Sequence, residues 1–243
     1  PMINQIENLK DEIKKYNFKI HIPEFTAVMT EEELCKIIGN YDAWIIGDDP
    51  CTEKVLVKGV NGKLKALVKW GVGVDNVDFD ACKKYNIPVT NTPAMFGEEV
   101  SDIAINYILT LTRETHIINE NVRKGIWYKP AGRTLVGRKV ALIGFGDIGR
   151  TVARKCLAFN LHVNVSDPGF YHDIETNEIK CKYNKELVIP DSIQKVNICE
   201  NLEEAVLSCN YIIVTCSLNK HTKGMINKKI IKLEAKGVIV INV

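Results

Sequence analysis

The feature that most constrains the fold is a Gly-Phe-Gly-Asp-Ile-Gly turn at residues 144–149, between a strand pattern and a helix pattern. The apolar run 140–143 leads directly into it, and apolar residues recur after it at helical spacing. Gly144 would allow the tight turn, Gly146 would let the backbone approach a pyrophosphate, and Gly149 would let helix and strand pack closely. The free N–H groups of the helix N-terminus attract phosphate. The segment predicts a dinucleotide site, although a purely structural glycine turn has the same spacing.

An acidic residue follows this turn at the distance that such a site requires. Asp167 lies 18 residues beyond Gly149, at the end of the next predicted strand. A carboxylate at this place can accept both hydrogen bonds of an adenosine ribose and would repel a 2′-phosphate. We therefore expect NAD rather than NADP as the cofactor. The alternative is an ordinary aspartate at the end of a strand.

The first half of the chain alternates strand patterns with helix patterns. Apolar residues gather or alternate at 18–22, 43–46, 64–68 and 87–89, which are lengths typical of strands. Thr30 with Glu33 three residues later forms a capping-box pattern. Asp49 before Pro50 places a cap ahead of a helix-starting proline. Apolar strands alternating with helices predict an α/β protein whose parallel sheets are covered on both faces.

The second half repeats this alternation after one long helical pattern. A helix is expected from about Glu98 to Arg123, followed by a loop at 129–133. Strands are expected at 140–143, 161–165, 196–199, 211–214 and 238–241, whereas a complete dinucleotide-binding sheet usually has about six. The polar stretch 169–195 is interpreted as an insertion whose structure stays open. The chain stops on an apolar strand pattern, an unusual natural end, and is expected to be a fragment.

Composition excludes several classes of partner. The chain is 46% hydrophobic and 26% charged with a net charge of +2, which is typical of a globular protein and gives no reason to expect nucleic acid or an anionic membrane. No apolar run approaches the roughly 20 residues of a membrane span. None of the eight cysteines forms a C-x-x-C pair, and no signal-peptide pattern is present. We expect free thiols and a reducing, cytoplasmic location.

A second glycine turn, Gly71-Val72-Gly73, follows the strand pattern at 64–68. The backbone N–H groups of such a turn can bind a carboxylate. A structural interpretation competes with this one, because the turn could simply lead from strand to helix with Asp78 as the helix cap.

Four stretches of the chain share their order and spacing with one known family. They are 69–78 (Lys-Trp-Gly-Val-Gly-Val-Asp-Asn-Val-Asp), 91–93 (Asn-Thr-Pro) with 99–102 (Glu-Val-Ser-Asp), 137–149, and 211–243, which includes Thr-Cys-Ser-Leu at 215–218 and His-Thr-Lys-Gly-Met-Ile-Asn at 221–227. On these residues the chain resembles the D-isomer-specific 2-hydroxyacid dehydrogenase family, and within it the phosphoglycerate dehydrogenase-like branch.

The resemblance implies two doubly wound, parallel-sheet domains. A flavodoxin-like substrate-binding domain is expected at residues 1–110, and a Rossmann NAD-binding domain, incomplete, at 111–243. The implied activity is NAD-dependent oxidation or reduction at the CH–OH group of a D-2-hydroxy acid. The implied partners are a small 2-hydroxy or 2-keto acid and a second copy of the chain in a homodimer. No metal is expected.

The resemblance also assigns site residues. The substrate carboxylate and the nicotinamide would lie near Gly71, Val72 and Gly73. Cofactor contacts are expected from Val72, Gly144, Gly146, Asp147, Ile148, Gly149, Asp167, Thr215, Cys216, Ser217 and Thr222. Cys216 is interpreted as a wall of the cofactor cleft rather than as a nucleophile.

The catalytic residues of the family are expected outside this chain. The family uses an Arg, a His and a Glu that would all follow Asn242-Val243, so the chain itself is expected to be inactive and to bind NAD weakly or not at all. The five histidines are each interpreted as structural or solvated: His21, His116, His162, His172 and His221.

The chain departs from the family pattern at several positions. Ser217 stands where proline is common, and Ser101-Asp102 where Ala-Glu is common. Together with the long stretch 169–195, these differences leave the substrate open. The alternative function is that of an NAD-sensing, corepressor-type binding protein of the same fold, without catalysis.

Overall fold

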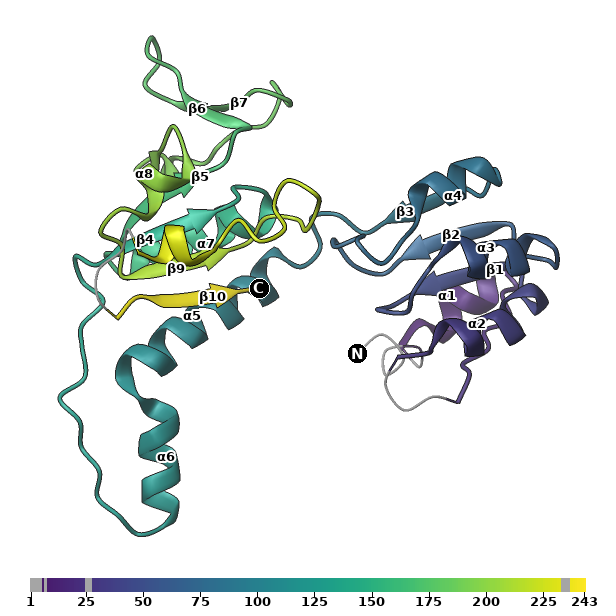
Figure 1. Cartoon of the computed structure of the whole chain (residues 1–243), viewed down its shortest axis with the longest axis horizontal. Helices are drawn as coiled ribbons and strands as arrows, with labels where there is room; N and C mark the ends of the chain where they lie inside the picture. Colours follow the sequence, from purple (N-terminus) through teal and green to yellow (C-terminus); the bar gives the residue numbers. More distant parts are fainter. Residues whose placement is uncertain (1–5, 7, 25–27, 233–236) are drawn as a thin grey trace. The chain divides into compact units, whose positions relative to one another are not determined.

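The computed structural model describes residues 6, 8–24, 28–232 and 237–243, and these form two compact units (Figure 1). The first holds the described residues up to Trp70 together with Asn76–Thr90. The second holds Gly71–Asp75 and the described residues from Asn91 onward. The domain boundary expected at residue 110 falls inside helix α5 (Gly97–Arg113), whose buried residues belong to the core of the second unit.

The first unit is a small α/β structure. Its sheet has the order β1-β2-β3, with β1 (Ala43–Ile46) parallel to β2 (Ala66–Lys69) and β3 (Val89–Asn91) beside β2. The helices are α1 (Lys10–Lys15), α2 (Glu31–Ile37), α3 (Glu53–Val60) and α4 (Phe79–Lys84), with a 3-10 turn at Ile38–Asn40. A buried cluster that includes Leu34, Ile46, Leu56 and Leu67 joins α2 and α3 to the sheet.

The strand expected at 18–22 is wrong. Phe18, Ile20 and Ile22 have no strand structure and are 67%, 45% and 42% exposed. An isolated alternating segment becomes a strand only when a neighbour accepts and donates its backbone hydrogen bonds. Within the described sheet of this unit β1 pairs with β2 alone, so the alternation has no partner.

One of the two predicted helix caps is confirmed and the other is wrong. At the start of α2, Thr30 Oγ1 accepts from Glu33 N at 3.3 Å and Glu33 Oε2 accepts from Thr30 N at 2.8 Å, which completes the capping box. Helix α3 begins at Glu53 and is capped by Thr52, not by Asp49. The backbone bends at residues 47–49, and Cys51 then forms a parallel bridge with Val77, so the helix cannot begin before Thr52.

The second unit is built on a five-stranded parallel sheet in the order β10-β9-β4-β5-β8. All five strands predicted for this half are confirmed, with small shifts at their ends. They are β4 (Lys139–Ile143), β5 (His162–Ser166), β8 (Asn197–Ile198), β9 (Tyr211–Val214) and β10 (Ile239–Asn242). The first strand in the sequence is central, and the chain builds outward from it on both sides, as in a doubly wound fold.

Helices cover both faces of this sheet because the side chains of β4 alternate between two cores. Val140 and Leu142 pack in the larger cluster with α5 and α7 (Asp147–Ala158). Ala141 and Ile143 pack in the smaller cluster with α8 (Leu202–Val206) and α9 (Lys228–Ile231). The expected α/β fold with parallel sheets is confirmed.

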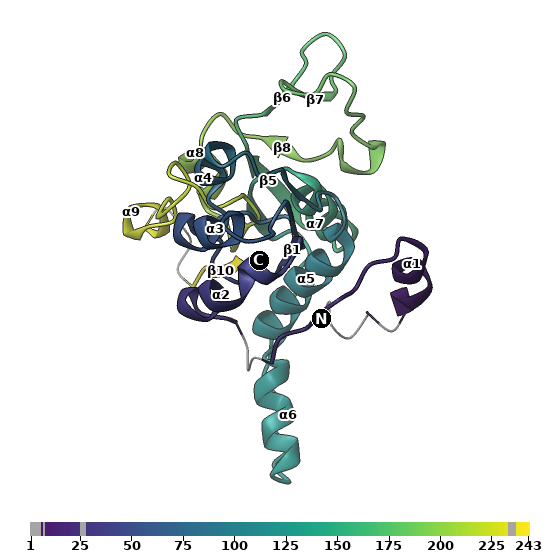
Figure 2. The ribbon, with the colours of Figure 1, turned by 90° about the vertical axis from the view of Figure 1, so that its right-hand side faces the viewer.

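The single long helix expected at 98–123 is interrupted. Glu114 adopts a left-handed conformation (φ 54°) between α5 and α6 (Thr115–Arg123), and Figure 2 shows α6 continuing beyond α5, away from the sheet. A left-handed residue ends the α-helical hydrogen-bond series. The buried face ends at Thr112, and α6 has no buried residue, so packing no longer holds one continuous helix.

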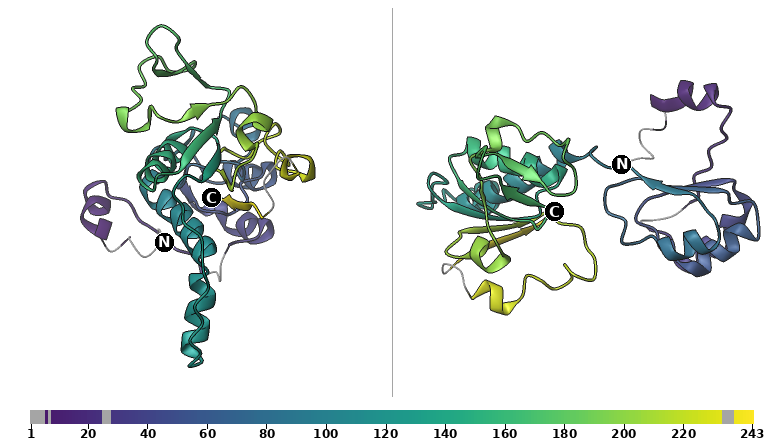
Figure 3. Two further views of the ribbon diagram at one scale, coloured as in Figure 1. Left: turned by 90° about the vertical axis from the view of Figure 1, so that its left-hand side faces the viewer. Right: turned by 90° about the horizontal axis from the view of Figure 1, so that it is seen from above.

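The insertion at 169–195 is an antiparallel hairpin, β6 (Phe170–His172) with β7 (Ile179–Cys181), followed by a 3-10 turn at Asp191–Ile193. The green hairpin stands away from the rest of the unit in Figure 3. Its base is anchored in the larger core, where the Phe170 ring meets Phe145 edge-on with centroids 5.1 Å apart. The insertion is thereby tied to the glycine turn.

Candidate functional site: the glycine turn at the carboxyl edge of the second sheet

The candidate site lies where β4 ends and α7 begins. β4 is the strand from which the chain order runs outward in both directions, with β5 on one side and β9 on the other (Figure 1). In doubly wound sheets, ligands bind outside the carboxyl ends of the strands at this point of reversal. The predicted glycine turn occupies this position.

Each glycine of the turn has a distinct structural reason. Gly144 has a φ of +97°, and a Cβ there would lie 2.8 Å from Cys216 N. A Cβ on Gly149 would lie 2.2 Å from Gly144 O, so only a glycine lets α7 approach β4 this closely. Gly146 differs from both, because it is exposed and no atom lies within 4 Å of its Cβ position.

The N-terminus of α7 has room and donors for an anion. Gly146 is the N-cap and offers no side-chain cap, and helical geometry leaves the N–H groups of Asp147 and Ile148 without intrahelical partners. The open space at Gly146 lies directly beside these donors. A phosphate group of a dinucleotide fits this arrangement of empty space and backbone N–H groups.

The structure brings Asp167 to the turn. Its Oδ2 accepts from Phe145 N at 2.7 Å and its Oδ1 accepts from Gly169 N at 2.8 Å. The carboxylate therefore fastens the middle of the turn to the end of β5. Each carboxylate oxygen can accept more than one hydrogen bond, so capacity remains for two further donors such as ribose hydroxyls.

The loop after β9 packs on the other side of the turn. Thr215 Oγ1 donates to Gly144 O at 2.9 Å, and Cys216 lies against Gly144. Farther along, Thr222 Oγ1 donates to Ser217 O at 2.7 Å and so closes the loop on itself. Burial raises the pKa of the Cys216 thiol, which disfavours the nucleophilic thiolate and favours its interpretation as a wall residue.

The Gly71-Val72-Gly73 turn is held by β3 and the residue after it. Gly71 N donates to Thr92 Oγ1 at 2.9 Å, and Asn91 Nδ2 donates to Val72 O at 3.2 Å. The structural interpretation of Asp78 is confirmed, since its Oδ1 accepts from Ala81 N at 2.9 Å and caps α4. No hydrogen bond among the described residues joins this turn to residues 144–149.

Two residues beside the glycine turn were missed by the sequence analysis. A Cβ on Gly97, at the start of α5, would lie 2.7 Å from Asp147 Oδ2, so this glycine lets α5 approach α7. Arg150 Nη1 donates to Phe145 O at 3.2 Å and braces the turn from within α7. The position of Arg150 directly after the last glycine was a usable signal, whereas nothing local distinguishes Gly97.

In the described part of the chain no group of three or more His, Cys, Asp or Glu side chains is placed to hold a metal ion. None of the helices in the described ranges is both long and apolar enough to cross a bilayer.

Sequence comparison identifies relatives of known class. Residues 105–243 match the family described as D-isomer specific 2-hydroxyacid dehydrogenase, NAD binding domain. Hydroxypyruvate reductase of Thermotoga maritima is 28% identical over 217 residues, covering 88% of this chain and 64% of that protein. D-3-phosphoglycerate dehydrogenase of Bacillus subtilis is 30% identical over 182 residues, covering 74% of this chain and 31% of that protein. The chain thus spans about a third to two thirds of the length of these relatives.

Solved structures show the same fold. The apo form of D-lactate dehydrogenase from Escherichia coli aligns with a TM-score of 0.75 at 21% identity, covering 98% of this chain and 70% of that one. The NAD⁺-bound 3-phosphoglycerate dehydrogenase of Entamoeba histolytica aligns with a TM-score of 0.75 at 22% identity, covering 98% and 67%.

Proposed function

Because the chain belongs to the D-isomer specific 2-hydroxyacid dehydrogenase family, we propose that it supplies the NAD-binding half of an oxidoreductase acting on a small D-2-hydroxy acid or its 2-keto form. The observation that carries this proposal is the open space at Gly146, bordered by the free N–H groups of α7 and by a turn that Asp167 holds in place. When bound, NAD accepts a hydride from C2 of the hydroxy acid, or NADH returns it to the keto carbon.

Different residues of the chain are assigned to different parts of the cofactor. Gly146, Asp147 and Ile148 present backbone N–H groups to the pyrophosphate. Asp167 accepts from the adenosine ribose hydroxyls and repels a 2′-phosphate, which selects NAD. The walls of the cofactor site are supplied by the loop after β9, through Thr215, Cys216, Ser217 and Thr222.

The substrate end is assigned to the first glycine turn. Gly71 and Gly73 would let backbone N–H groups approach the substrate carboxylate, and Val72 would lie between substrate and nicotinamide. The Gly71 N–H already binds Thr92 Oγ1, so Val72 and Gly73 are the candidate donors.

The transfer of a proton to or from the substrate is assigned to groups other than Asp167 and Cys216. Asp167 is engaged with two backbone N–H groups, and burial raises the pKa of Cys216, so neither is suited to act as general acid. We therefore expect this chain to bind NAD weakly and not to oxidise NADH in the presence of a keto acid. An NAD-sensing, corepressor-type protein would behave alike, but it would also change its affinity for a protein partner when NAD binds.

Amide NMR spectra titrated with NAD and with NADP test the proposal and detect even millimolar affinity. We expect NAD to shift the amides of residues 145–148 and of Asp167, and NADP to bind at least about tenfold more weakly, a difference of about 1.4 kcal/mol. A parallel assay follows NADH absorbance with glyoxylate, hydroxypyruvate or pyruvate. Shifts spread over the surface, or equal affinity for both cofactors, would contradict the cofactor site, and sustained turnover would contradict the assignment of proton transfer elsewhere.

We propose a homodimer whose contact includes the exposed apolar side chains on and after α6. Val122, Ile126 and Trp127 are 55%, 52% and 86% exposed, and large apolar side chains exposed this close together in the sequence suit an interaction surface. Sedimentation velocity is expected to give a dimer for the native chain and a monomer for Trp127→Ser. Identical sedimentation of the two proteins would contradict this surface.

A further inference from the structure

A cavity of about 450 Å³ lies in the second unit at the amino-terminal edge of its sheet. Arg138 and Asn210 line it, and each directly precedes a strand, β4 and β9 respectively. The strands are parallel, so their starts share one edge, and the glycine turn follows the other end of β4. The cavity is therefore separate from the candidate cofactor site by the length of that strand.

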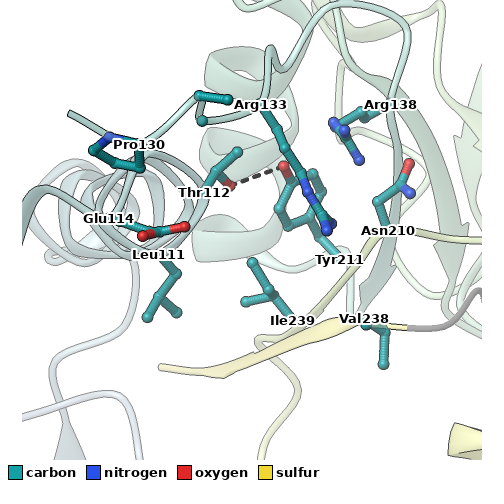
Figure 4. Close-up of a pocket in the computed structure, with 13 residues that line it drawn as sticks. Leu111, Thr112, Glu114, Pro130, Arg133, Arg138, Asn210, Tyr211, Val238 and Ile239 are labelled. Carbon is teal, nitrogen blue, oxygen red and sulfur yellow. Dashed lines mark hydrogen bonds between the residues drawn. The ribbon is translucent and has the colours of Figure 1, made fainter. Parts of the chain in front are cut away.

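Arginines dominate the charge of this cavity. Arg133 and Arg138 come from the loop before β4, and Figure 4 shows their side chains reaching into the same space as Asn210. A third arginine, Arg113, lies with its Nε 3.1 Å from the Cβ position of Gly132 in the cavity wall. Across the described ranges, none of these three forms an ion pair with a carboxylate, so no described carboxylate neutralises their charges.

A backbone hydrogen bond holds the side chain of Arg138, the arginine directly before β4. Arg138 Nε donates to Thr134 O at 2.6 Å, which fixes the guanidinium while leaving its two terminal nitrogens for a ligand. Among the described residues that line the cavity, Glu114 is the one carboxylate, and its Oε2 accepts from the Tyr128 hydroxyl at 3.0 Å. Two arginines against one carboxylate in the described lining, with Arg113 beside Gly132, give an excess of positive charge.

The neutral polar groups in the cavity also offer donors. Asn210 Oδ1 accepts from Lys139 N at 3.1 Å, which leaves the amide Nδ2 of Asn210 to donate. Two buried hydroxyls, of Thr112 and Tyr211, share a hydrogen bond of 2.9 Å, drawn as a dashed line in Figure 4. Only one of their two protons serves that bond, so one hydroxyl proton is left to donate.

From these observations we propose that the cavity binds a small polyanion, a ligand carrying two or more phosphate or carboxylate groups. Its volume suits a metabolite-sized molecule. Arg133 and Arg138 offer planar, forked donors that match phosphate or carboxylate oxygens, and Asn210 adds a neutral donor between the starts of β4 and β9. A ligand that bridges these groups stabilises the second unit by binding only its folded state.

The test uses inorganic pyrophosphate and citrate as probes, with acetate at matched ionic strength as the reference. Amide NMR spectra of the full chain distinguish this cavity from the cofactor turn. We expect saturable shifts at Gly132, Arg138 and Asn210 with at least one probe, and none of comparable size with acetate. A response to pyrophosphate alone identifies a phosphate ligand, a response to citrate alone a polycarboxylate, and a response to both supports the shared polyanion chemistry.

Arginine variants locate the site. Arg133→Gln and Arg138→Gln are each expected to weaken binding at least about tenfold, as the loss of a charge-assisted pair requires. Arg123→Gln in α6 removes the same charge at a residue that does not line the cavity, and it is expected to change affinity less than about twofold. Equal effects of all three variants, shifts confined to residues 145–148, or no saturable binding of either probe at millimolar concentration would overturn the proposal. None of these outcomes depends on NAD binding.

Discussion

Gly149→Ala is expected to destabilise the second unit by about 3 kcal/mol, the upper range for forcing one extra carbon into a packed site. The added Cβ would lie 2.2 Å from Gly144 O, a backbone atom of the adjacent turn, and 3.1 Å from Thr215 Oγ1. Neither α7 nor the glycine turn can shift easily to make room for the added carbon. Val152 and Cys156 anchor α7 in the core, and the turn is tied to the carboxylate at the end of β5. Urea unfolding followed by circular dichroism measures the loss.

Gly146→Ala is the matched control. The same carbon is added three residues earlier, where nothing lies within 4 Å and the φ of −65° suits any residue. Its free energy of unfolding is expected to stay within about 0.5 kcal/mol of the native value. Its NAD-induced amide shifts are expected to disappear, because the methyl group fills the space proposed for the pyrophosphate. If both variants lose equal stability, or if Gly146→Ala still binds NAD normally, the separate roles given to the two glycines are wrong.

The features predicted correctly from the sequence are those that short-range patterns specify. The glycine turn needs a strand before it and a helix after it, and both are legible within about 20 residues of Gly146. The Thr30 capping box involves residues three apart. Each strand of the second sheet places apolar side chains in or against the two cores, and β4 and β9 are buried along most of their length, so their apolar runs are visible in the sequence.

The incorrect predictions all concern segments whose structure depends on contacts with residues far away in the sequence. Residues 18–22 alternate like a strand, but no described strand pairs with them. Asp49 looks like a helix cap, but its Oδ1 accepts from Met29 N at 2.9 Å, 20 positions earlier in the chain. The helical period continues past Glu114, although burial stops at Thr112. In each case a long-range contact, or its absence, overrides a plausible local pattern.

The arginine cavity could not be anticipated for the same reason. Its lining comes from the end of α5, the loop before β4, and the starts of β9 and β10. In the sequence alone, Arg133 and Arg138 look like ordinary surface charges ahead of a predicted strand. Only the sheet order, which places the starts of β4 and β9 side by side, brings Asn210 next to Arg138.

Asp167→Ala is expected to reduce both stability and cofactor selectivity. Its carboxylate accepts from the buried Phe145 N–H, and removal leaves that donor unsatisfied, at about 2 kcal/mol of unfolding free energy. The ribose hydroxyls lose their acceptor and a 2′-phosphate loses its repulsion, so the preference for NAD over NADP should fall at least about tenfold. Unfolding curves and NMR titrations with both cofactors measure the two effects separately.

Asp173→Ala in the β6–β7 hairpin is the control that separates these effects. Asp173 also accepts two backbone N–H groups, from Glu175 and Thr176 at 3.0 Å each, and the hydrogen bond from Lys180 lowers its pKa to about 2, so it too is ionised at neutral pH. At this hairpin, water can accept the hydrogen bonds that the Asp173 carboxylate loses, so the loss of unfolding free energy should be smaller than for Asp167→Ala. The preference for NAD over NADP should not change. Should Asp167→Ala lose stability yet keep the native preference for NAD, Asp167 would be a structural clamp on the turn and the selectivity would have to come from elsewhere. A joint loss would tie the two roles to one carboxylate, which holds Phe145 and Gly169 and would accept from the ribose with its remaining acceptor positions.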